Sequence, residues 1–437
     1  MFTVMTIAGS DSGGGAGVQA DARTFAALGV FGTSVVTAIT AQNTLGVLDV
    51  YNLPADIVVA QMSAVLSDID IRSVKTGMLA TVEIAEAVVD VLSRLEVPIV
   101  VDPVMAAEAG GKLVIGEMKD VLARLLPKAE VVTPNIREAE AISGVAIHSL
   151  DDMKRAAYEI YALGPRSVVV TGGHLTGTDV LYDGDFELLR GKLIKGGTHG
   201  AGCTFSAAVA AFLAQGHSVS QSALLAKAFV TEAIKNSESI GSGPGVVNQV
   251  AATLDRAERY FTLLNVDAGL RTIKTINLDL IPEVGSNLAM AISRAKKPAE
   301  VAAVKGRIAK VEGTITTVGC VTFGASRHMA RVVLAALQYD PTLKSAMSVR
   351  CSDEVIGACR ELNLVTESFE RADEPKVVGT KEWGPARAIE RSVSHGAGVP
   401  DVIFDYGSTA KEPMAHVFGH SAQHVAETVV KISSTLK

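Results

Sequence analysis

Short apolar runs alternate with helix-length amphipathic stretches through the first 200 residues of the chain. The runs cover residues 4–8, 33–39, 99–101, 131–133 and 168–171. Between two of these runs, residues 80–95 carry apolar side chains at the spacing of a helix that packs on a sheet, at Ile84, Val88, Val91, Leu92 and Leu95. This alternation predicts repeated strand–helix–strand units, and therefore a doubly wound, mostly parallel α/β sheet.

The composition agrees with a parallel sheet covered by helices. Apolar residues make up 48% of the chain and aromatic residues only 5%, as expected where buried strands lie under helices. Residues 180–182 and 186–189, joined through Asp183-Gly184, predict a β-hairpin with a primed turn.

A second pattern starts after the glycine-rich segment 241–245. We interpret residues 246–264 as an amphipathic helix and place a boundary near Asn265. Beyond it, a second, smaller α/β domain is expected, with strands at 276–281, 307–311, 314–318, 346–350, 402–404 and 414–418. The predicted domains are therefore residues 1–250, a linker helix at 251–264, and residues 265–437.

Charge and cysteine content narrow the class of partner. The net charge of −7 gives no basic surface for nucleic acid and no polybasic segment for anionic lipid. The four cysteines form no CxxC pair, and no apolar stretch approaches the length needed to span a bilayer. The apolar residues 1–8 lack a basic segment before them, so we expect a first strand rather than a secretion signal. These features predict a cytoplasmic protein that acts on small molecules, without nucleic acid or membrane partners.

Polar residues collect just after the predicted strands. The glycine-rich segment 9–17, Asp102, Asn135 and Gly172-Gly173 all occupy such positions. In open parallel sheets, ligands bind outside the carboxyl ends of the strands, so we expect these segments to meet at one crevice.

The segment Gly196–Thr204 opens directly into the alanine-rich stretch 205–215. Backbone N–H groups at Gly200, Ala201 and Gly202 would form an anion hole at the start of this helix, where the helix dipole favours negative charge. Cys203 would lie in the first turn, where the pKa of a thiol tends to fall, and would accept the proton of a substrate hydroxyl. A plain structural loop is the alternative for such a glycine-rich turn taken alone.

The first domain resembles hydroxymethylpyrimidine and hydroxymethylpyrimidine phosphate kinases, a branch of the ribokinase-like superfamily. The motifs that carry the resemblance are residues 6–21 (TIAGSDSGGGAGVQAD), 40–44 (TAQNT), 75–79 (KTGML), 102–105 (DPVM), 133–135 (TPN) with Glu138-Ala139, and 199–204 (HGAGCT). Sugar kinases of the superfamily usually carry Asp where this chain has Cys203, so the thiol favours the vitamin-kinase branch.

The resemblance implies roles for individual residues. Asp21 and Gln42 would contact the polar edge of the pyrimidine, and Gly9, Met78 and Val104 would line its pocket. Asp102, Asn135, Glu138 and Thr171 would lie near ATP and Mg²⁺, with Asp102 and Glu138 as the metal ligands. Many relatives have Lys at the position of Thr171, so a direct cationic contact to ATP is not expected there.

Structural alternatives exist for several of these residues. Met78 and Val104 follow strands and are equally well explained as core residues. Asp102 with Pro103 would simply end a strand, and Glu138 would be a first-turn acid that stabilises its own helix.

The C-terminal part resembles the thiamine phosphate synthase domain that is often fused behind this kinase. The resemblance rests on residues 280–287 (LIPEVGSN), 304–308 (VKGRI), 323–331 (FGASRHMAR), 348–350 (SVR), 399–401 (VPD) and 417–419 (VFG). It implies that Arg307 and His328 are needed for synthesis. Arg307 or Arg327 would offer a fixed fork of donors for a diphosphate, the alternative for each being a surface cation, and His328 would lie at a helix N-terminus.

Together, the two resemblances imply a bifunctional enzyme of thiamine biosynthesis. It would convert hydroxymethylpyrimidine to its phosphate and diphosphate with ATP and Mg²⁺, and then couple the diphosphate with hydroxyethylthiazole phosphate, releasing pyrophosphate. We expect a homodimer.

Three alternatives remain open from the sequence. The C-terminal domain also resembles the effector domain of thiamine-responsive regulators and would then be a sensor. The kinase would otherwise be of the pyridoxal type. Finally, His416, His420 and His424 are spaced four apart, which raises a metal site, although a strand and a helix are expected to separate them.

Overall fold

The computed structural model describes residues 1–104, 121–173, 175–370, 383–408 and 411–436. Met105, which belongs to the motif 102–105 quoted above, lies outside these ranges. The chain divides into two compact units, Met1–Thr253 and Leu254–Lys437. Each unit has its own sheet and its own hydrophobic cores.

The N-terminal unit is built on a nine-stranded sheet in the order β3-β2-β1-β4-β5-β6-β7-β8-β9. The six strands from β2 to β7 pair in parallel, while β3, β8 and β9 are antiparallel to their neighbours. This arrangement confirms the predicted doubly wound, mostly parallel sheet. The strands are β1 (Thr3–Ser10), β2 (Phe31–Asn43), β3 (Gly46–Asn52), β4 (Ser73–Thr76), β5 (Ile99–Val101), β6 (Val131–Val132), β7 (Val168–Val170), β8 (Asp179–Tyr182) and β9 (Phe186–Leu189).

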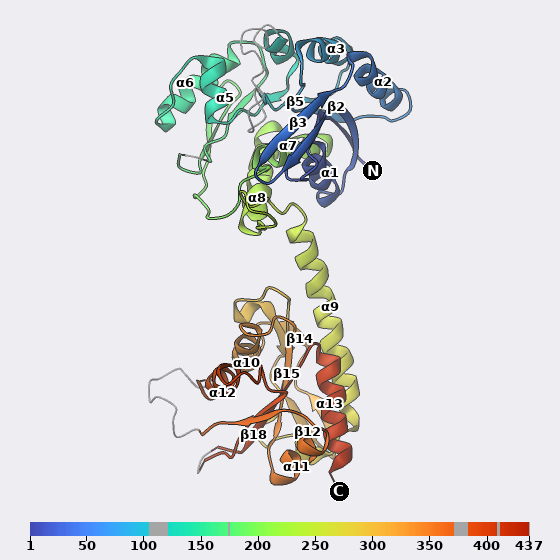
Figure 1. Cartoon of the computed structure of the whole chain (residues 1–437), viewed down its shortest axis with the longest axis vertical. Helices are drawn as coiled ribbons and strands as arrows, with labels where there is room; N and C mark the ends of the chain where they lie inside the picture. The colour runs from blue at the N-terminus through green and yellow to red at the C-terminus, as the bar shows by residue number, and fades with distance from the viewer. Residues whose placement is uncertain (105–120, 174, 371–382, 409–410, 437) are drawn as a thin grey trace. The chain divides into compact units, whose positions relative to one another are not determined.

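Helices cover both faces of this sheet (Figure 1). One face packs against α2 (Ala55–Leu66), α3 (Val82–Leu92), α5 (Ile136–Ser143) and α6 (Leu150–Tyr161). The other face packs against α1 (Gly17–Ala27), α7 (Ala201–Ala214) and α8 (Val219–Lys235). Alternate residues of each strand face alternate cores, so Met5 and Ile7 of β1 pack on one side and Val4 on the other.

The predicted hairpin forms, but its connection differs from the prediction. Tyr182 pairs with Phe186, so three residues, Asp183 to Asp185, join β8 to β9. Gly184 takes a positive φ of 115° within this connection. A two-residue primed turn is therefore wrong, because the loop is one residue longer than that turn allows.

The helix predicted over residues 246–264 also differs. Val246 instead forms isolated bridges with His199 and Glu238, which ties this segment to the N-terminal unit. The helix α9 runs from Ala251 to Thr272.

The C-terminal unit contains a seven-stranded sheet in the order β14-β11-β10-β15-β18-β17-β16 and a separate hairpin of β12 and β13. Its strand pairs are antiparallel except for β16 with β17. The strands are β10 (Leu288–Ala291), β11 (Val301–Val304), β12 (Ile308–Val311), β13 (Thr314–Thr317), β14 (Val321–Phe323), β15 (Ser345–Arg350), β16 (Thr366–Ser368), β17 (Val402–Asp405) and β18 (Met414–Gly419).

Helices again lie on both faces of this sheet. The helices α10 (Arg327–Leu337) and α12 (Trp383–Ser394) lie on one side of β15 and β18, and α13 (Ala422–Thr435) lies on the other (Figure 1). The helix α11 (Asp353–Glu361) packs in the same core as α13.

One predicted strand of this unit is wrong and four are new. Residues 276–281 contain a 3-10 turn, Leu278–Leu280, because the Asn277 side chain accepts a hydrogen bond from the backbone of Asp279 and closes the turn. The strands β10, β11, β14 and β16 were not expected. The first two are rich in alanine, which favours strands only weakly, so burial under helices rather than propensity determines their conformation.

Candidate functional site

The strand ends of the N-terminal sheet place three polar side chains on the face that α1 and α7 cover. Val4 and Val100 belong to the core on this face. Alternation along each strand puts Thr6, Lys75 and Asp102 on the same side. Thr6 and Lys75 are direct partners in the register of β1 and β4. All three side chains are buried.

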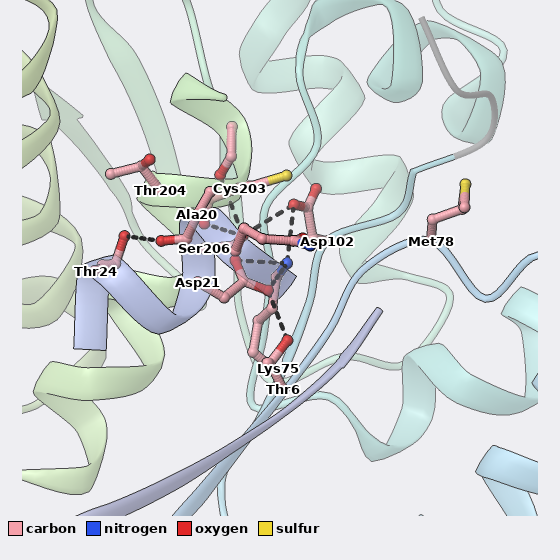
Figure 2. A network of polar contacts seen from close by, with 12 residues as sticks. Thr6, Ala20, Asp21, Thr24, Lys75, Met78, Asp102, Cys203, Thr204 and Ser206 are labelled. Atoms are coloured by element: carbon pink, nitrogen blue, oxygen red, sulfur yellow. Dashed lines mark hydrogen bonds and ion pairs between the residues drawn. The ribbon is translucent and has the colours of Figure 1, made fainter. Parts of the chain in front are cut away.

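Asp21 of α1 binds two of these residues. Its Oδ2 accepts a hydrogen bond of 2.6 Å from Thr6 Oγ1. Lys75 Nζ lies 2.9 Å from Oδ2 and 3.2 Å from Oδ1 (Figure 2). Asp21 and Lys75 are both 0% exposed. The structure therefore places Asp21 inside a buried ion pair, whereas the family resemblance implied that it contacts the pyrimidine.

Lys75 also links Asp21 to Asp102. Its Nζ lies 3.9 Å from Asp102 Oδ2, which in turn accepts a hydrogen bond of 2.9 Å from Ser206 Oγ of α7 (Figure 2). Burial would lower the pKa of Lys75, but the nearby acidic groups, Asp21 first among them and then Asp102, together outweigh this effect and raise the pKa above its usual value. Burial raises the pKa of Asp102, and Lys75 only partly offsets that rise. One ammonium group thus stabilises two buried carboxylates.

The N-terminus of α7 is formed by a glycine in the left-handed region. Gly200 has a φ of 84°, and a Cβ there would lie 1.9 Å from the carbonyl oxygen of Gly15. Gly202, by contrast, has no atom within 4 Å of where its Cβ would stand. Close packing against Gly15 therefore explains the glycine at position 200. Gly202 instead leaves open space beside the first turn of the helix, where an anion could reach the backbone N–H groups.

Cys203 lies half-buried in this first turn. The sequence predicts a lowered thiol pKa, and the structure contradicts this. Burial raises the pKa of Cys203 to about 12, with a further rise from Asp102 and Asp21; Lys75 and a hydrogen bond with the Gly17 backbone act in the opposite direction. In the ligand-free protein the thiol is therefore protonated at neutral pH.

The glycine-rich segment 9–17 is organised by Asp11. Its carboxylate accepts hydrogen bonds from the backbone of Gly13 (2.8 Å) and Ala16 (2.7 Å), and His199 Nε2 lies 3.3 Å from Oδ2. Burial raises the pKa of Asp11, but the contacts to His199 and the two backbone groups outweigh it and lower the pKa. Asp11 and His199 therefore hold the glycine-rich loop against the turn that opens α7.

The residues predicted to line the pyrimidine pocket have the following contacts in the structure. Gly9 contacts Met78, since a Cβ on Gly9 would stand 2.4 Å from Met78 Cε. Gln42 is half-buried, and its Oε1 accepts a hydrogen bond of 3.3 Å from Thr40 Oγ1. Val104 is half-buried and lines a cavity whose wall is formed by Thr76, Gly77, Leu79, Val101, Asp102, Pro103, Val104, Leu122 and Leu125. Asp102 is thus common to the buried network and this cavity.

Asn135 and Glu138 form a capping box at the start of α5. Asn135 Oδ1 accepts a hydrogen bond of 3.0 Å from the Glu138 N–H, and Glu138 Oε2 accepts one of 2.9 Å from the Asn135 N–H. Thr171 forms an isolated bridge with Asn135. The three residues are brought together as predicted from their positions after strands, but the capping box also gives Asn135 and Glu138 a structural role.

Metal ligands are sparse among the residues that the structure describes. No three His, Cys, Asp or Glu side chains gather there in a way that would hold a metal ion. Asp102 offers hard oxygen at a strand end. Mg²⁺ is often bound by one or two carboxylates together with substrate phosphates, so this residue fits a nucleotide-linked magnesium ion.

In the C-terminal unit, Arg307 and His328 are both exposed. Arg307 follows β11, donates a hydrogen bond to the Val284 carbonyl and packs on Gly285. His328 lies in the first turn of α10, and its ring faces the ring of the buried His416 at 5.4 Å between centroids. His420 pairs separately with His424, at 5.5 Å, so the three histidines spaced four apart do not form one cluster.

Sequence reasoning missed Lys75 and Ser206 as parts of the site. A signal for Lys75 was present, because it opens the motif KTGML on which the resemblance rests, and a lysine inside a strand must find a carboxylate partner if it is buried. No comparable signal marked Ser206, which lies in an alanine-rich helix and is connected to Asp102 only by the fold.

The chain matches two family models in succession. Residues 11–248 match the model for phosphomethylpyrimidine kinase, and residues 265–431 match the model for thiamine-phosphate synthase ThiN. A bifunctional thiamine biosynthesis protein, ThiDN, from Methanocaldococcus jannaschii is 30% identical over 446 residues. The alignment covers 100% of this chain and 100% of that relative.

Two further relatives cover the N-terminal unit. The bifunctional protein ThiED from Geobacter sulfurreducens is 42% identical over 264 residues, which are 59% of this chain; the chain spans only about half (54%) of that relative. Pyridoxal kinase from Staphylococcus aureus, solved with AMP-PCP and pyridoxal, is 40% identical with a TM-score of 0.54, covering 58% of this chain and 94% of that one.

Proposed function

Because this chain belongs to the phosphomethylpyrimidine kinase family and carries a thiamine-phosphate synthase region behind the kinase, we propose that it performs two consecutive steps of thiamine biosynthesis. The N-terminal unit phosphorylates hydroxymethylpyrimidine and its phosphate. The C-terminal unit couples the resulting diphosphate with hydroxyethylthiazole phosphate to give thiamine phosphate and pyrophosphate. The observation that carries the proposal is the full-length similarity to a bifunctional ThiDN protein, with both regions in the same order.

ATP is the proposed phosphoryl donor. The solved pyridoxal kinase with AMP-PCP supports a nucleotide site in the N-terminal unit. We assign Mg²⁺ to Asp102 and, through water or directly, to Glu138, where it would neutralise phosphate charge. The N–H groups at the start of α7 would hold the transferring phosphoryl group, because they lie at the positive end of the helix beside the open space at Gly202.

Cys203 is the proposed acceptor of the substrate's hydroxyl proton. It lies in the first turn of α7 and is coupled electrostatically to Lys75. Since burial keeps the thiol protonated in the ligand-free protein, Cys203 must first release its own proton to solvent as the substrates bind, and only the resulting thiolate can accept the proton of the substrate hydroxyl. The ammonium group of Lys75 favours that ionisation.

The decisive experiment supplies the purified full-length chain with hydroxymethylpyrimidine, hydroxyethylthiazole phosphate and MgATP. We expect thiamine phosphate, detected by mass spectrometry. Accumulation of the pyrimidine diphosphate without thiamine phosphate would disprove the synthase half. Tight binding of thiamine phosphate without turnover would instead support a sensor domain.

Pyridoxal kinase activity is the second candidate for the N-terminal unit. The 40% identity to a pyridoxal kinase of known structure favours testing it. In the test, pyridoxal and hydroxymethylpyrimidine compete as phosphoryl acceptors in one reaction, and the rate of phosphorylation of each is measured. A higher kcat/KM for pyridoxal would replace the proposed first step.

We also propose a homodimer formed through β3. This edge strand exposes apolar side chains, with Leu48 at 79% and Tyr51 at 65% of their full accessibility. Exposed apolar side chains on a sheet edge favour association with another chain. Sedimentation velocity tests this: the wild type should sediment as a dimer, and a Leu48→Lys variant should sediment as a monomer.

Finally, we propose that the chain works in the cytoplasm, where its four free thiols would stay reduced.

A further inference from the structure

A row of buried polar residues crosses three neighbouring strands of the C-terminal sheet. Asn287, Ser348 and His416 are 6%, 4% and 2% exposed. Ser348 of β15 stands directly opposite His416 of β18. Asn287, just before β10, donates its N–H to Ser348 Oγ and accepts the Ser348 N–H at its carbonyl, both at 3.2 Å. The three side chains therefore lie at one level of the sheet.

This row lies on the face of the sheet that α10 covers. Next along the same strands, Ala289, Ala346 and Phe418 belong to the apolar core that includes Met329 and Val333 of α10. Two-residue alternation puts Asn287, Ser348 and His416 on that same face. The core under α10 thus changes from apolar to polar toward the helix N-terminus, where His328 lies.

The three residues of the row differ in what they bind. The Asn287 side chain pairs with the backbone of Val304, through Nδ2 to the carbonyl at 2.9 Å and from the N–H to Oδ1 at 3.0 Å, so it has a structural role. Ser348 Oγ accepts the Asn287 N–H, which leaves the proton of its own hydroxyl to donate. On the side of β18, the cross-strand neighbour of Ser348 on this face is His416.

His416 in turn faces His328. The two rings are 5.4 Å apart at an interplanar angle of 50°. One imidazole is exposed and the other is buried, so the pair joins solvent to the polar row. A buried imidazole among apolar side chains is costly unless it is hydrogen-bonded, and a phenylalanine would fill the same space. Packing alone therefore gives no reason for a histidine here.

We propose that His416, supported by Ser348, is a positioning residue for His328 in the synthase reaction, which rests on the function proposed above. In that reaction the bond between the pyrimidine methylene carbon and the diphosphate oxygen breaks, and its electron pair leaves with the diphosphate. The thiazole nitrogen supplies the pair for the new C–N bond. His416 holds the exposed His328 ring so that a ring N–H donates to the departing diphosphate, without net proton transfer.

The test uses the full-length chain with synthetic pyrimidine diphosphate and thiazole phosphate, so that the kinase step is bypassed. His416→Phe keeps the ring volume and removes the polar ring atoms. We expect kcat to fall about 10- to 100-fold with little change in KM, as is typical when a supporting residue is lost. His416→Gln, which keeps a side-chain N–H, should recover part of the rate, and Ser348→Ala should lower it a few-fold.

A double-mutant cycle separates positioning from packing. If His416 acts through His328, then His416→Phe adds nothing to the defect of His328→Gln. If the two defects multiply, or if the loss of rate follows unfolding of the C-terminal unit, His416 is a core residue and the proposal is wrong. Should His416→Phe not fold, His416→Gln and Ser348→Ala carry the same test.

Two controls accompany the cycle. The second histidine pair of this unit, His420 with His424, has nearly the same ring separation, and His424→Phe should leave synthesis unchanged. Formation of the pyrimidine diphosphate by the same preparations should also be unchanged. If the wild type makes no thiamine phosphate from the supplied substrates, the proposed function itself fails, and this inference fails with it.

Discussion

The two units place their candidate sites in similar positions but build them from different chemistry. Each site lies where buried strands end under the N-terminus of a helix, α7 in one unit and α10 in the other. In the N-terminal unit the buried groups are ions, Lys75 between Asp21 and Asp102. In the C-terminal unit the buried groups are a hydroxyl and an imidazole, and the cation Arg307 is exposed.

The difference follows from the two reactions that we propose. Phosphorylation requires that a weakly acidic alcohol lose its proton, so a base must be tuned by charges in a dry environment. Coupling instead releases a diphosphate that is already an anion, and an exposed guanidinium with hydrogen-bond donors is enough to stabilise it. Loss of a buried charge should therefore affect both folding and catalysis, whereas loss of the exposed charge should affect catalysis alone.

The largest effect is expected for Lys75→Met. It leaves two buried carboxylates without their cation, which costs about 3–5 kcal/mol of stability. Kinase activity should be lost, while the C-terminal unit stays folded. Circular dichroism during urea unfolding measures the loss of stability, and synthesis of thiamine phosphate from supplied pyrimidine diphosphate shows that the C-terminal unit stays folded.

Lys227→Met is the matched control for this variant. Lys227 pairs with Asp179 at 2.8 Å, and both side chains are mostly buried, but neither belongs to the network of Lys75. We expect a loss of stability with kinase rates within a few-fold of wild type at temperatures where the protein is folded. Equal behaviour of the two variants would show that Lys75 has only a structural role.

Cys203→Ala should lower kcat for hydroxymethylpyrimidine about 10²- to 10⁴-fold, the usual contribution of a general base. Rates are measured separately for the alcohol and for its phosphate. Unchanged rates for the alcohol would exclude Cys203 as the base. Because the pKa of Cys203 is raised to about 12, its alkylation by iodoacetamide at pH 7 should be slow and should speed up as the pH rises. The exposed Cys320 serves as the reference thiol in mass spectrometry.

Gly202→Ala tests the anion hole at α7. A Cβ at Gly202 meets no protein atom within 4 Å, so stability should be nearly unchanged. A methyl group that displaces the phosphate by about 1 Å is expected to lower kcat about 100-fold. Gly200→Ala is the contrasting variant: its φ of 84° and the clash with Gly15 should destabilise the N-terminal unit by at least about 1–2 kcal/mol. Wild-type rates for Gly202→Ala would place the phosphate elsewhere.

The sequence predicted the N-terminal fold well because its strands obey simple rules. Parallel strands buried on both faces are short runs of Val and Ile, and β5 was predicted to the residue. In the C-terminal unit, β10 and β11 consist largely of alanine, and burial together with pairing in the sheet, rather than propensity, makes them strands. Their absence from the prediction also hid the position of Asn287 next to Ser348.

The candidate sites were predicted unevenly for a related reason. Motifs identified Cys203, Asp102 and Asp21, but sequence position alone does not show that Asp21 points at Lys75 or that burial raises the thiol pKa. Those facts depend on which strands are neighbours. Likewise, His416 was noticed for its spacing to His420 and His424, whereas its ring contacts His328, 88 residues earlier in the chain.

The smallest effect, and the sharpest contrast with Lys75, is expected for Arg307→Gln. Arg307 is exposed, so stability should change by no more than about 0.5 kcal/mol. Synthesis of thiamine phosphate should slow about 10- to 100-fold, the range for losing a charged hydrogen bond, and Arg307→Lys should recover only part of the rate, since lysine lacks the planar fork. Salt provides the control. An exposed charge is screened within about 8 Å at physiological ionic strength, so added salt should raise the KM of the wild-type synthase more than that of Arg307→Gln. Equal salt dependence in the two proteins would show that Arg307 does not bind the diphosphate.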